Sequence, residues 1–117
     1  PELRLDAEAQ IRQLTEAVVM DFQRLGPFGH GNHKPLLCCR EVELSMAPRR
    51  VGRNGEHLQL FIRQGDARMK AIAFNKGAWF ERLAPGMKLD LAAEPQINEY
   101  MGNRSVELEV KDLRPAS

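Results

Sequence analysis

The sequence predicts a mainly β fold: a small five-stranded barrel with one N-terminal amphipathic helix and a short helix between strands three and four. Three observations lead to this prediction. Apolar residues recur at helical spacing over residues 6–25, polar and apolar residues alternate with a period of two after Pro35, and a short aromatic segment interrupts that alternation. At 117 residues, with 43% hydrophobic and 28% charged content, the chain fits one domain.

The helix is expected from Asp6 to Leu25, and Gly26-Pro27 is its stop signal. Asp6 suits the N-cap, because a carboxylate accepts hydrogen bonds from the free N–H groups of a first helical turn. The apolar residues lie three or four positions apart, which places them on one face of the helix. These residues are Ala7, Ile11, Leu14, Val18, Phe22 and Leu25.

A connector rich in glycine and proline follows over residues 26–35. Such a backbone can present N–H groups to a phosphate, but the segment matches neither the P-loop nor the dinucleotide-binding fingerprint, which favours a plain connector. His30, His33, Cys38 and Cys39 lie close together in the sequence. Zinc thiolates normally stand two or more residues apart, and adjacent strand residues point to opposite faces, so we expect buried free thiols and no metal site.

Five strands are expected, over residues 36–45, 57–64, 67–75, 88–97 and 104–113. The second is the clearest, because Leu58, Leu60 and Ile62 alternate with residues of the opposite face. The third is fairly apolar on both faces, so its inward side stays open. Trp79 and Phe80 belong to a predicted short helix over 78–83. This element order is that of the oligonucleotide-binding (OB) fold, and an SH3-type barrel would not place a helix there.

We therefore divide the chain into a linker helix with its connector, residues 1–35, and an OB barrel, residues 36–117. No apolar stretch approaches the roughly 18 residues of a membrane span, and the N-terminus lacks the pattern of a signal peptide. A cytoplasmic location without membrane contact is the resulting expectation, and it agrees with free thiols in a reducing compartment.

OB folds usually bind nucleic acid across the second and third strands, between the first–second and fourth–fifth loops. An outward Phe61 is informative, because a base can stack on such a ring for about 1–3 kcal/mol; the alternative is that the N-terminal helix covers it. Basic, polar and aromatic residues in these regions form the predicted nucleic-acid-binding set: Arg49, Arg50, Arg53, His57, Gln59, Phe61, Arg63, Tyr100 and Arg104.

Charge does not decide between two functions, a single-strand-binding module and a protein-interaction barrel. The 17 Lys and Arg residues nearly balance the 16 Asp and Glu residues. Catalytic chemistry has little support, because no nucleophile–base pair and no converging carboxylates occur at a recognisable spacing. We therefore expect no catalytic residues in this chain.

The run from Gly26 to Asn32, followed by Pro35, resembles the Pro-Phe-Gly-x-Gly-Asn-x-x-Pro signature of the bacterial RecJ family of single-strand-specific 5′→3′ exonucleases. Further similar segments are Arg53–Leu58, Ala71–Phe74, Ile97–Tyr100 and Val110–Pro115, so the resemblance spans nearly the whole chain. Two positions depart from the family pattern. His33 replaces a proline, and Gln59 stands where a basic residue commonly follows His-Leu, which removes one expected phosphate contact.

The resemblance implies the OB domain of a larger exonuclease of DNA repair and recombination. It implies single-stranded DNA as the ligand, the catalytic domains of the same parent chain as neighbours, and repair proteins as further candidate partners. The family's metal-binding aspartate and histidine motifs are absent from this sequence. Mn²⁺ or Mg²⁺ is accordingly expected in the parent's catalytic core, and no cofactor is expected here.

Overall fold

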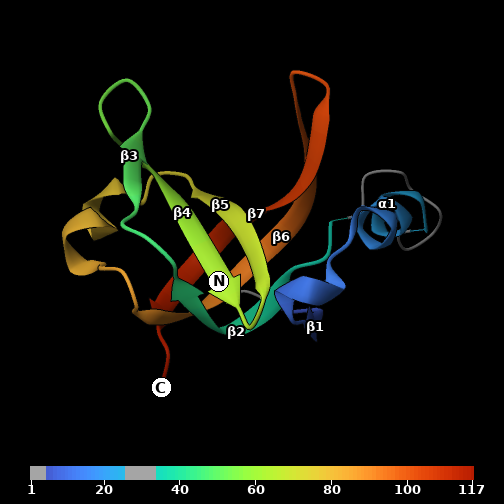
Figure 1. Cartoon of the computed structure of the whole chain (residues 1–117), viewed down its shortest axis with the longest axis horizontal. Coiled ribbons are helices and arrows are strands. Elements are labelled where there is room, and N and C mark those ends of the chain that lie inside the picture. Colours follow the sequence, from blue (N-terminus) through green and yellow to red (C-terminus); the bar gives the residue numbers. More distant parts are fainter. Residues whose placement is uncertain (1–4, 26–33) are drawn as a thin grey trace.

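The computed structural model describes residues 5–25 and 34–117, and its centre is a closed β-barrel. Five long strands form it: β2 (Leu37–Leu44), β4 (His57–Gln64), β5 (Ala67–Ala73), β6 (Lys88–Tyr100) and β7 (Asn103–Pro115). The sheet order is β1-β2-β6-β7-β5-β4-β3, and an additional pairing of β2 with β4 closes the circle (Figure 1). The predicted five-stranded OB barrel is confirmed, with the short strands β1 (Ala7–Glu8) and β3 (Arg49–Val51) added at the sheet edges.

The N-terminal segment is only partly the expected helix. It forms β1, then the 3₁₀ helix η1 (Ile11–Gln13), and only then α1 (Glu16–Leu25). The prediction of Asp6 as a helix N-cap is wrong, because its Oδ2 accepts the Leu36 N–H at 2.8 Å and so holds β1 parallel to β2. Thr15 caps the helix instead, since its Oγ1 accepts the Val18 N–H at 3.2 Å.

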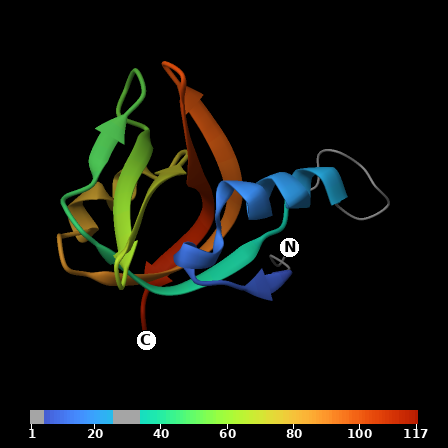
Figure 2. The same cartoon turned by 45° about the vertical axis from the view of Figure 1, so that its right-hand side comes forward.

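The same segment nevertheless supplies part of the barrel core. Ile11, Leu14 and Val19 are buried in one cluster with the strand residues, and Phe22 packs against that cluster. The Ile11 N–H donates to the Gln64 side-chain oxygen at 2.7 Å, which ties η1 to the end of β4. Figure 2 shows α1 lying beside the β6–β7 side of the barrel. The connector signature with its two histidines lies outside the described residues.

The strand pattern was predicted well. Leu58, Leu60 and Ile62 of β4 are buried, as alternation indicated. The open question for β5 is answered, because Ala71 and Ala73 are fully buried and the alternate residues therefore face outward. Small inward residues let the barrel wall approach the core closely.

The short aromatic helix between β5 and β6 is hydrogen-bonded to the β3–β4 turn and holds it in place. It is the 3₁₀ helix η3 (Gly77–Arg82), and its Gly77 N–H donates to the Glu56 carbonyl oxygen at 2.9 Å. A Cβ at Gly77 would lie 2.3 Å from the Gly55 carbonyl oxygen, so only glycine permits this contact. Trp79 and Phe80 remain half-buried, and Leu83, which follows η3, is buried.

The two loops expected to grip a ligand are more ordered than predicted. The first–second connector contains β3, which pairs with β4. The fourth–fifth loop is reduced to a two-residue turn at Met101-Gly102, with φ values of 52° and 81°, the positive pair that a type I′ hairpin requires. In Figure 1 the β3–β4 turn and the β6–β7 turn stand on the same side of the barrel.

Two further sequence predictions concern the cysteines and the membrane. Cys38 and Cys39 are both free, as predicted, but only Cys39 is buried; the prediction of a buried thiol is wrong for Cys38, which is half-buried because it points to the outer side of β2. Burial, with a smaller contribution from the neighbouring Cys38, raises the pKa of the Cys39 thiol to about 11. Among the described helices, none is long and apolar enough to cross a membrane.

Candidate nucleic-acid interface

Strand register assembles one outer face from β3, β4, β5 and β7. Residues paired directly across strands share a face of the sheet, so the pairing identifies neighbours. The two central rows are Arg49–Gln59–Ile72–Glu109 and Phe61–Lys70–Glu107. We call this surface the β4–β5 face. It carries an aromatic ring, a basic residue and a carboxylate side by side.

A pocket of about 480 Å³ opens on this face. Phe61, Lys70 and Glu107 contribute to its lining, with Arg68 from β5 and Ser105 from β7. Phe61 is half-buried and borders this opening, and the helix α1 contacts β6 and β7. The structure therefore leaves a route by which a planar group could reach the Phe61 ring.

The described residues contain five large exposed apolar side chains, Leu5, Met46, Phe74, Tyr100 and Met101. Met46 lines the same pocket, and Phe74 directly follows β5. Tyr100 and Met101 at the β6–β7 turn are the most exposed, at 70% and 82%. Exposed aromatic residues on a polar strand face are suited to stacking with bases.

The cations of the face differ in how strongly other side chains engage them. Arg49, Arg68 and Lys70 are exposed, and no ion pair within residues 5–25 and 34–117 includes them. Arg53 is likewise exposed, in the β3–β4 turn. Arg63 shares the face but pairs with Glu43 at 2.8 Å. The first four cations are the ones available to an anionic ligand.

Two predicted site residues point away from the face. Arg50 lies opposite the buried Leu58, and its guanidinium stacks 5.0 Å from the Phe80 ring centroid. Arg104 pairs with Glu16 of α1 at 3.4 Å. Both fix the position of neighbouring elements, since Arg50 links β3 to η3 and Arg104 links the β6–β7 hairpin to α1.

His57 supports an aromatic neighbour. Its Nδ1 accepts the Asn75 N–H at 3.0 Å, and its ring meets the Phe74 ring edge-on at 5.1 Å between centroids. The hydrogen bond makes Nε2 the protonated nitrogen of the neutral ring. Phe74 is thereby held at the end of β5 with 48% of its surface exposed.

Sequence reasoning missed Met46, Arg68, Lys70 and Phe74 as members of the site. The signal for Lys70 was present, because a two-residue turn at Gly65-Asp66 pairs Gln64 with Ala67 and hence Phe61 with Lys70. Counting back from that turn would have found it.

The β6–β7 side of the barrel is acidic by contrast. Lys111 partly neutralises it by contacting Glu109 and, at 3.8 Å, Glu94. The hydrogen bond to Glu109 raises the pKa of Lys111, against a smaller lowering by desolvation. Glu107 is not in this cluster.

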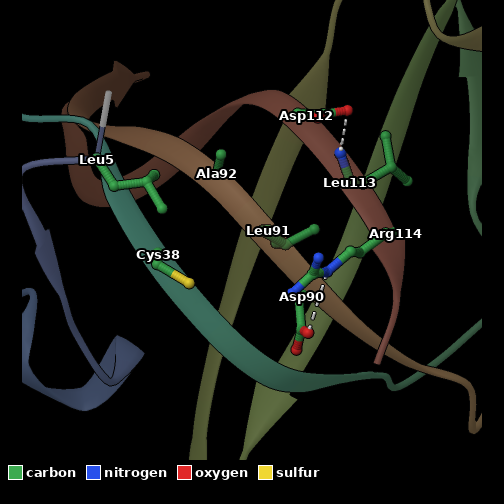
Figure 3. Close-up of a pocket in the computed structure, with 8 residues that line it drawn as sticks. All are labelled: Leu5, Cys38, Asp90, Leu91, Ala92, Asp112, Leu113 and Arg114. Carbon is green, nitrogen blue, oxygen red and sulfur yellow. Dashed lines mark hydrogen bonds and ion pairs between the residues drawn. The ribbon is translucent and has the colours of Figure 1, made fainter. Parts of the chain in front are cut away.

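A second, smaller pocket of about 190 Å³ lies over β2, β6 and β7 (Figure 3). Both carboxylate oxygens of its buried Asp90 have a partner within the chain. Oδ1 accepts the Glu41 N–H at 3.0 Å, and Oδ2 pairs with Arg114 at 3.5 Å. Glu41 has a φ of 54° at an irregularity in β2, so Asp90 stabilises a strained bend. The described ranges contain no group of three or more His, Cys, Asp or Glu side chains suited to a metal ion.

Comparisons with known proteins agree with this geometry. The family model of the RecJ OB domain matches residues 5–112. The single-stranded-DNA-specific exonuclease RecJ of Bacillus subtilis (strain 168) is 28% identical over 112 residues, and that of Haemophilus influenzae is 34% identical over 97 residues. These matches cover 96% and 78% of this chain but only 14% and 16% of the relatives, so the chain spans about one-seventh of their length.

Solved structures extend the comparison. RecJ from Thermus thermophilus in complex with Mn²⁺ matches with a TM-score of 0.51 and 26% identity, over 80% of this chain and 13% of that one. An aspartyl-tRNA synthetase from Entamoeba histolytica matches with a TM-score of 0.55 and 17% identity, over 69% of this chain and 18% of that one. The second likeness shows the fold alone.

Proposed function

The chain belongs to the RecJ OB-domain family, and on that premise we propose that it is the single-stranded-DNA-binding module of a 5′→3′ exonuclease. Catalysis resides elsewhere in the parent protein, in domains that use Mn²⁺ or Mg²⁺ and act in the cytoplasm in DNA repair and recombination. In this division of labour residues 36–117 hold the strand, and residues 1–35 join the barrel to the catalytic domains.

The observation that carries the proposal is the pairing of Phe61 with Lys70 at an open pocket. A base stacks on the ring while the ammonium group meets the adjacent phosphate, which is how single-strand-binding grooves combine their two contacts. Arg49, Arg53 and Arg68 continue the phosphate track on the same side of the barrel. Sequence-independent charge of this kind supplies most of the affinity for a nucleic acid.

The remaining predicted residues take supporting roles. Gln59 lies between Arg49 and Ile72 and offers a neutral hydrogen bond. Tyr100 offers a second stacking surface at the β6–β7 turn. Arg63 forms an ion pair with Glu43, and Arg104 forms one with Glu16. These two pairs hold neighbouring elements in place and so preserve the shape of the face.

A titration tests the proposal directly. The chain is titrated into a fluorescein-labelled single strand of about 12 nucleotides, within the roughly 4–16 nucleotides that one OB fold covers, and anisotropy is read at several salt concentrations. Four phosphate contacts, one for each of the cations Arg49, Arg53, Arg68 and Lys70, predict a slope of log affinity against log salt of about −3. The matching duplex should compete poorly. A flat salt response, or equal affinity for duplex and single strand, contradicts the proposal.

The competing function is a protein-interaction barrel that braces the nuclease or recruits a repair protein. The acidic β6–β7 side and the exposed Met101 favour it. The two functions separate in the same titration, because an interaction barrel without DNA contact leaves the anisotropy unchanged even at low salt.

A further inference from the structure

The pocket of the β4–β5 face has two chemically different walls. Arg68 and Lys70 of β5 form a basic strip along its middle, Phe61 of β4 stands on one side of this strip, and Ser105 and Glu107 of β7 form a polar wall on the other side. A volume of about 480 Å³ falls within the roughly 300–1,000 Å³ usual for sites that hold a small organic group. A stacking ring, a cation and an anion that line one pocket suit one nucleotide, with its base on Phe61, its phosphate on the basic strip and the edge of its base toward the polar wall.

Glu107 differs from the neighbouring carboxylate on the same strand. Glu109 accepts a hydrogen bond from Lys111 and is paired with it. No ion pair or side-chain hydrogen bond recorded for the described part of the chain engages Glu107, although Lys70 is its cross-strand neighbour. Glu107 is half-buried at the pocket wall. Its carboxylate can therefore accept a hydrogen bond from a donor group of a ligand in the pocket.

We propose that this pocket is a nucleobase subsite that selects bases carrying an exocyclic amino group, with Glu107 as the acceptor. The inference rests on the proposed function and deepens it. Cytosine presents an N4 amino donor, and a carboxylate accepts from it; thymine presents the O4 acceptor at the equivalent position, which a carboxylate repels. Phe61 contributes equally to both pyrimidines by stacking, so the discrimination comes from Glu107.

The arrangement of charges also fixes which way the nucleotide enters. Phosphate is attracted to Arg68 and Lys70 and is repelled by Glu107, Glu109 and Glu94. The backbone therefore runs along Arg68 and Lys70 of β5, and the base lies on Phe61 of β4 with its amino edge turned toward β7. This orientation directs the Watson–Crick edge to Glu107 without any requirement for a contact to the sugar.

The test compares two labelled oligonucleotides of about 12 nucleotides, all dC and all dT, at pH 7.5. The unmodified chain is expected to bind the dC strand about tenfold more tightly, the size of one good base contact. Glu107→Gln should bring the ratio close to one, because an amide donates to O4 as readily as it accepts from N4. Glu109→Gln removes the same charge from the same strand and should leave the ratio near tenfold. Circular dichroism checks that both variants are folded.

The outcomes separate this inference from the proposed function. Equal binding of dC and dT by the unmodified chain overturns the base subsite and leaves single-strand binding intact. An equal loss of preference in Glu109→Gln also overturns it, because the effect would then be one of general charge. Absence of binding to both strands refutes the proposed function and the subsite together.

Discussion

The β4–β5 face can be compared with the outer surface of β2 and β6, which we call the β2–β6 face. The two faces belong to one barrel but differ in how their arginines and lysines are paired. On the β2–β6 face, Arg40 pairs with Glu8 at 3.1 Å and Arg114 with Asp90 at 3.5 Å. On the β4–β5 face, Arg49, Arg68 and Lys70 have no such partner among residues 5–25 and 34–117. Arg63 is the exception on the β4–β5 face, since it pairs with Glu43. A net charge of only +1 therefore conceals a group of three cations that have no ion pair among the described residues and lie on one face.

The difference bears on function more than on stability. Surface ion pairs contribute only about 0–1 kcal/mol each, so pairing the cations of one face adds little to the fold. Pairing does remove the local field that would attract a polyanion. Arg68 and Lys70 line the same pocket as Phe61 and have no ion pair within the described part of the chain, so that field stays in place. The distribution of ion pairs therefore distinguishes the two faces, which the total charge does not.

The largest expected effect comes from neutralising the open face. Each phosphate contact contributes about 0.7 log units of affinity per tenfold change in salt, so Arg49→Ala, Arg68→Ala and Lys70→Ala together should weaken single-strand binding about 100-fold at 0.1 M salt. The salt slope should fall to about −0.7, the contribution of the one remaining contact at Arg53. Anisotropy titration of the triple variant measures both quantities.

A matched triple variant tests whether position matters or only charge. Arg24→Ala, Arg40→Ala and Lys88→Ala remove three positive charges from α1, β2 and the start of β6, away from the face. Charges farther than about 10 Å are screened at this ionic strength, so affinity should change no more than about threefold. A loss comparable to that of the first triple variant would mean that the two faces do not differ.

Substitutions on the β2–β6 face should lower the free energy of unfolding and leave single-strand binding unchanged. Asp90→Ala leaves the Glu41 N–H of the β2 bend without its acceptor and is expected to cost about 2 kcal/mol of unfolding free energy. Asp90→Asn keeps an acceptor oxygen at that position and should cost less than about half as much. Urea unfolding with an unchanged m-value measures the cost. Equal midpoints for Asp90→Ala and the unmodified chain would show that the bend does not need the carboxylate.

Phe61 offers a smaller effect that distinguishes stacking from simple apolar contact. Phe61→Leu keeps an apolar side chain but removes the ring, and should weaken single-strand binding about tenfold, within the 1–3 kcal/mol of a base–aromatic stack. Phe61→Trp keeps a stacking surface and should bind as well as the unmodified chain. If Leu and Trp behave alike, the ring does not stack with a base.

The barrel was predictable because period-two alternation is a local signal, and Leu58, Leu60 and Ile62 carry it clearly. The start of the helix was not. Ile11 and Leu14 stand three residues apart, a spacing that a 3₁₀ turn and an α-helix satisfy equally. What decided between them was the Asp6 carboxylate bonding Leu36, thirty residues away in the sequence, a contact that no local pattern reveals.

The strands of the candidate β4–β5 face were predictable from the sequence, but the orientation of its individual side chains was not. Arg49 and Arg50 are neighbours in the sequence, yet the β3–β4 pairing turns Arg49 outward with Gln59 and Arg50 toward Phe80. The sequence predicted a loop over these residues, and side chains in a loop do not alternate between two faces. Only when β3 is known to be a strand does alternation place Arg49 and Arg50 on opposite sides. The ion pair of Arg104 was not predictable for a related reason, since its partner Glu16 belongs to a helix that packs from outside the barrel.

The smallest expected effect concerns the two thiols of β2. Cys39 points into the barrel core, and Cys38 points to the outer side of the strand. Iodoacetamide should modify Cys38, which is half-buried at the small pocket, well before Cys39, which becomes reactive only on unfolding. Because the pKa of folded Cys39 is about 11 against an ordinary 9.0, the folded state holds this proton more tightly than the unfolded state. Its contribution to stability is therefore complete below pH 9 and is lost as the pH rises toward 11. Cys39→Ala should flatten the decline in unfolding free energy between about pH 9 and pH 10. Equal alkylation rates for the two thiols in the native chain would show that the wall at β2 is open on both sides.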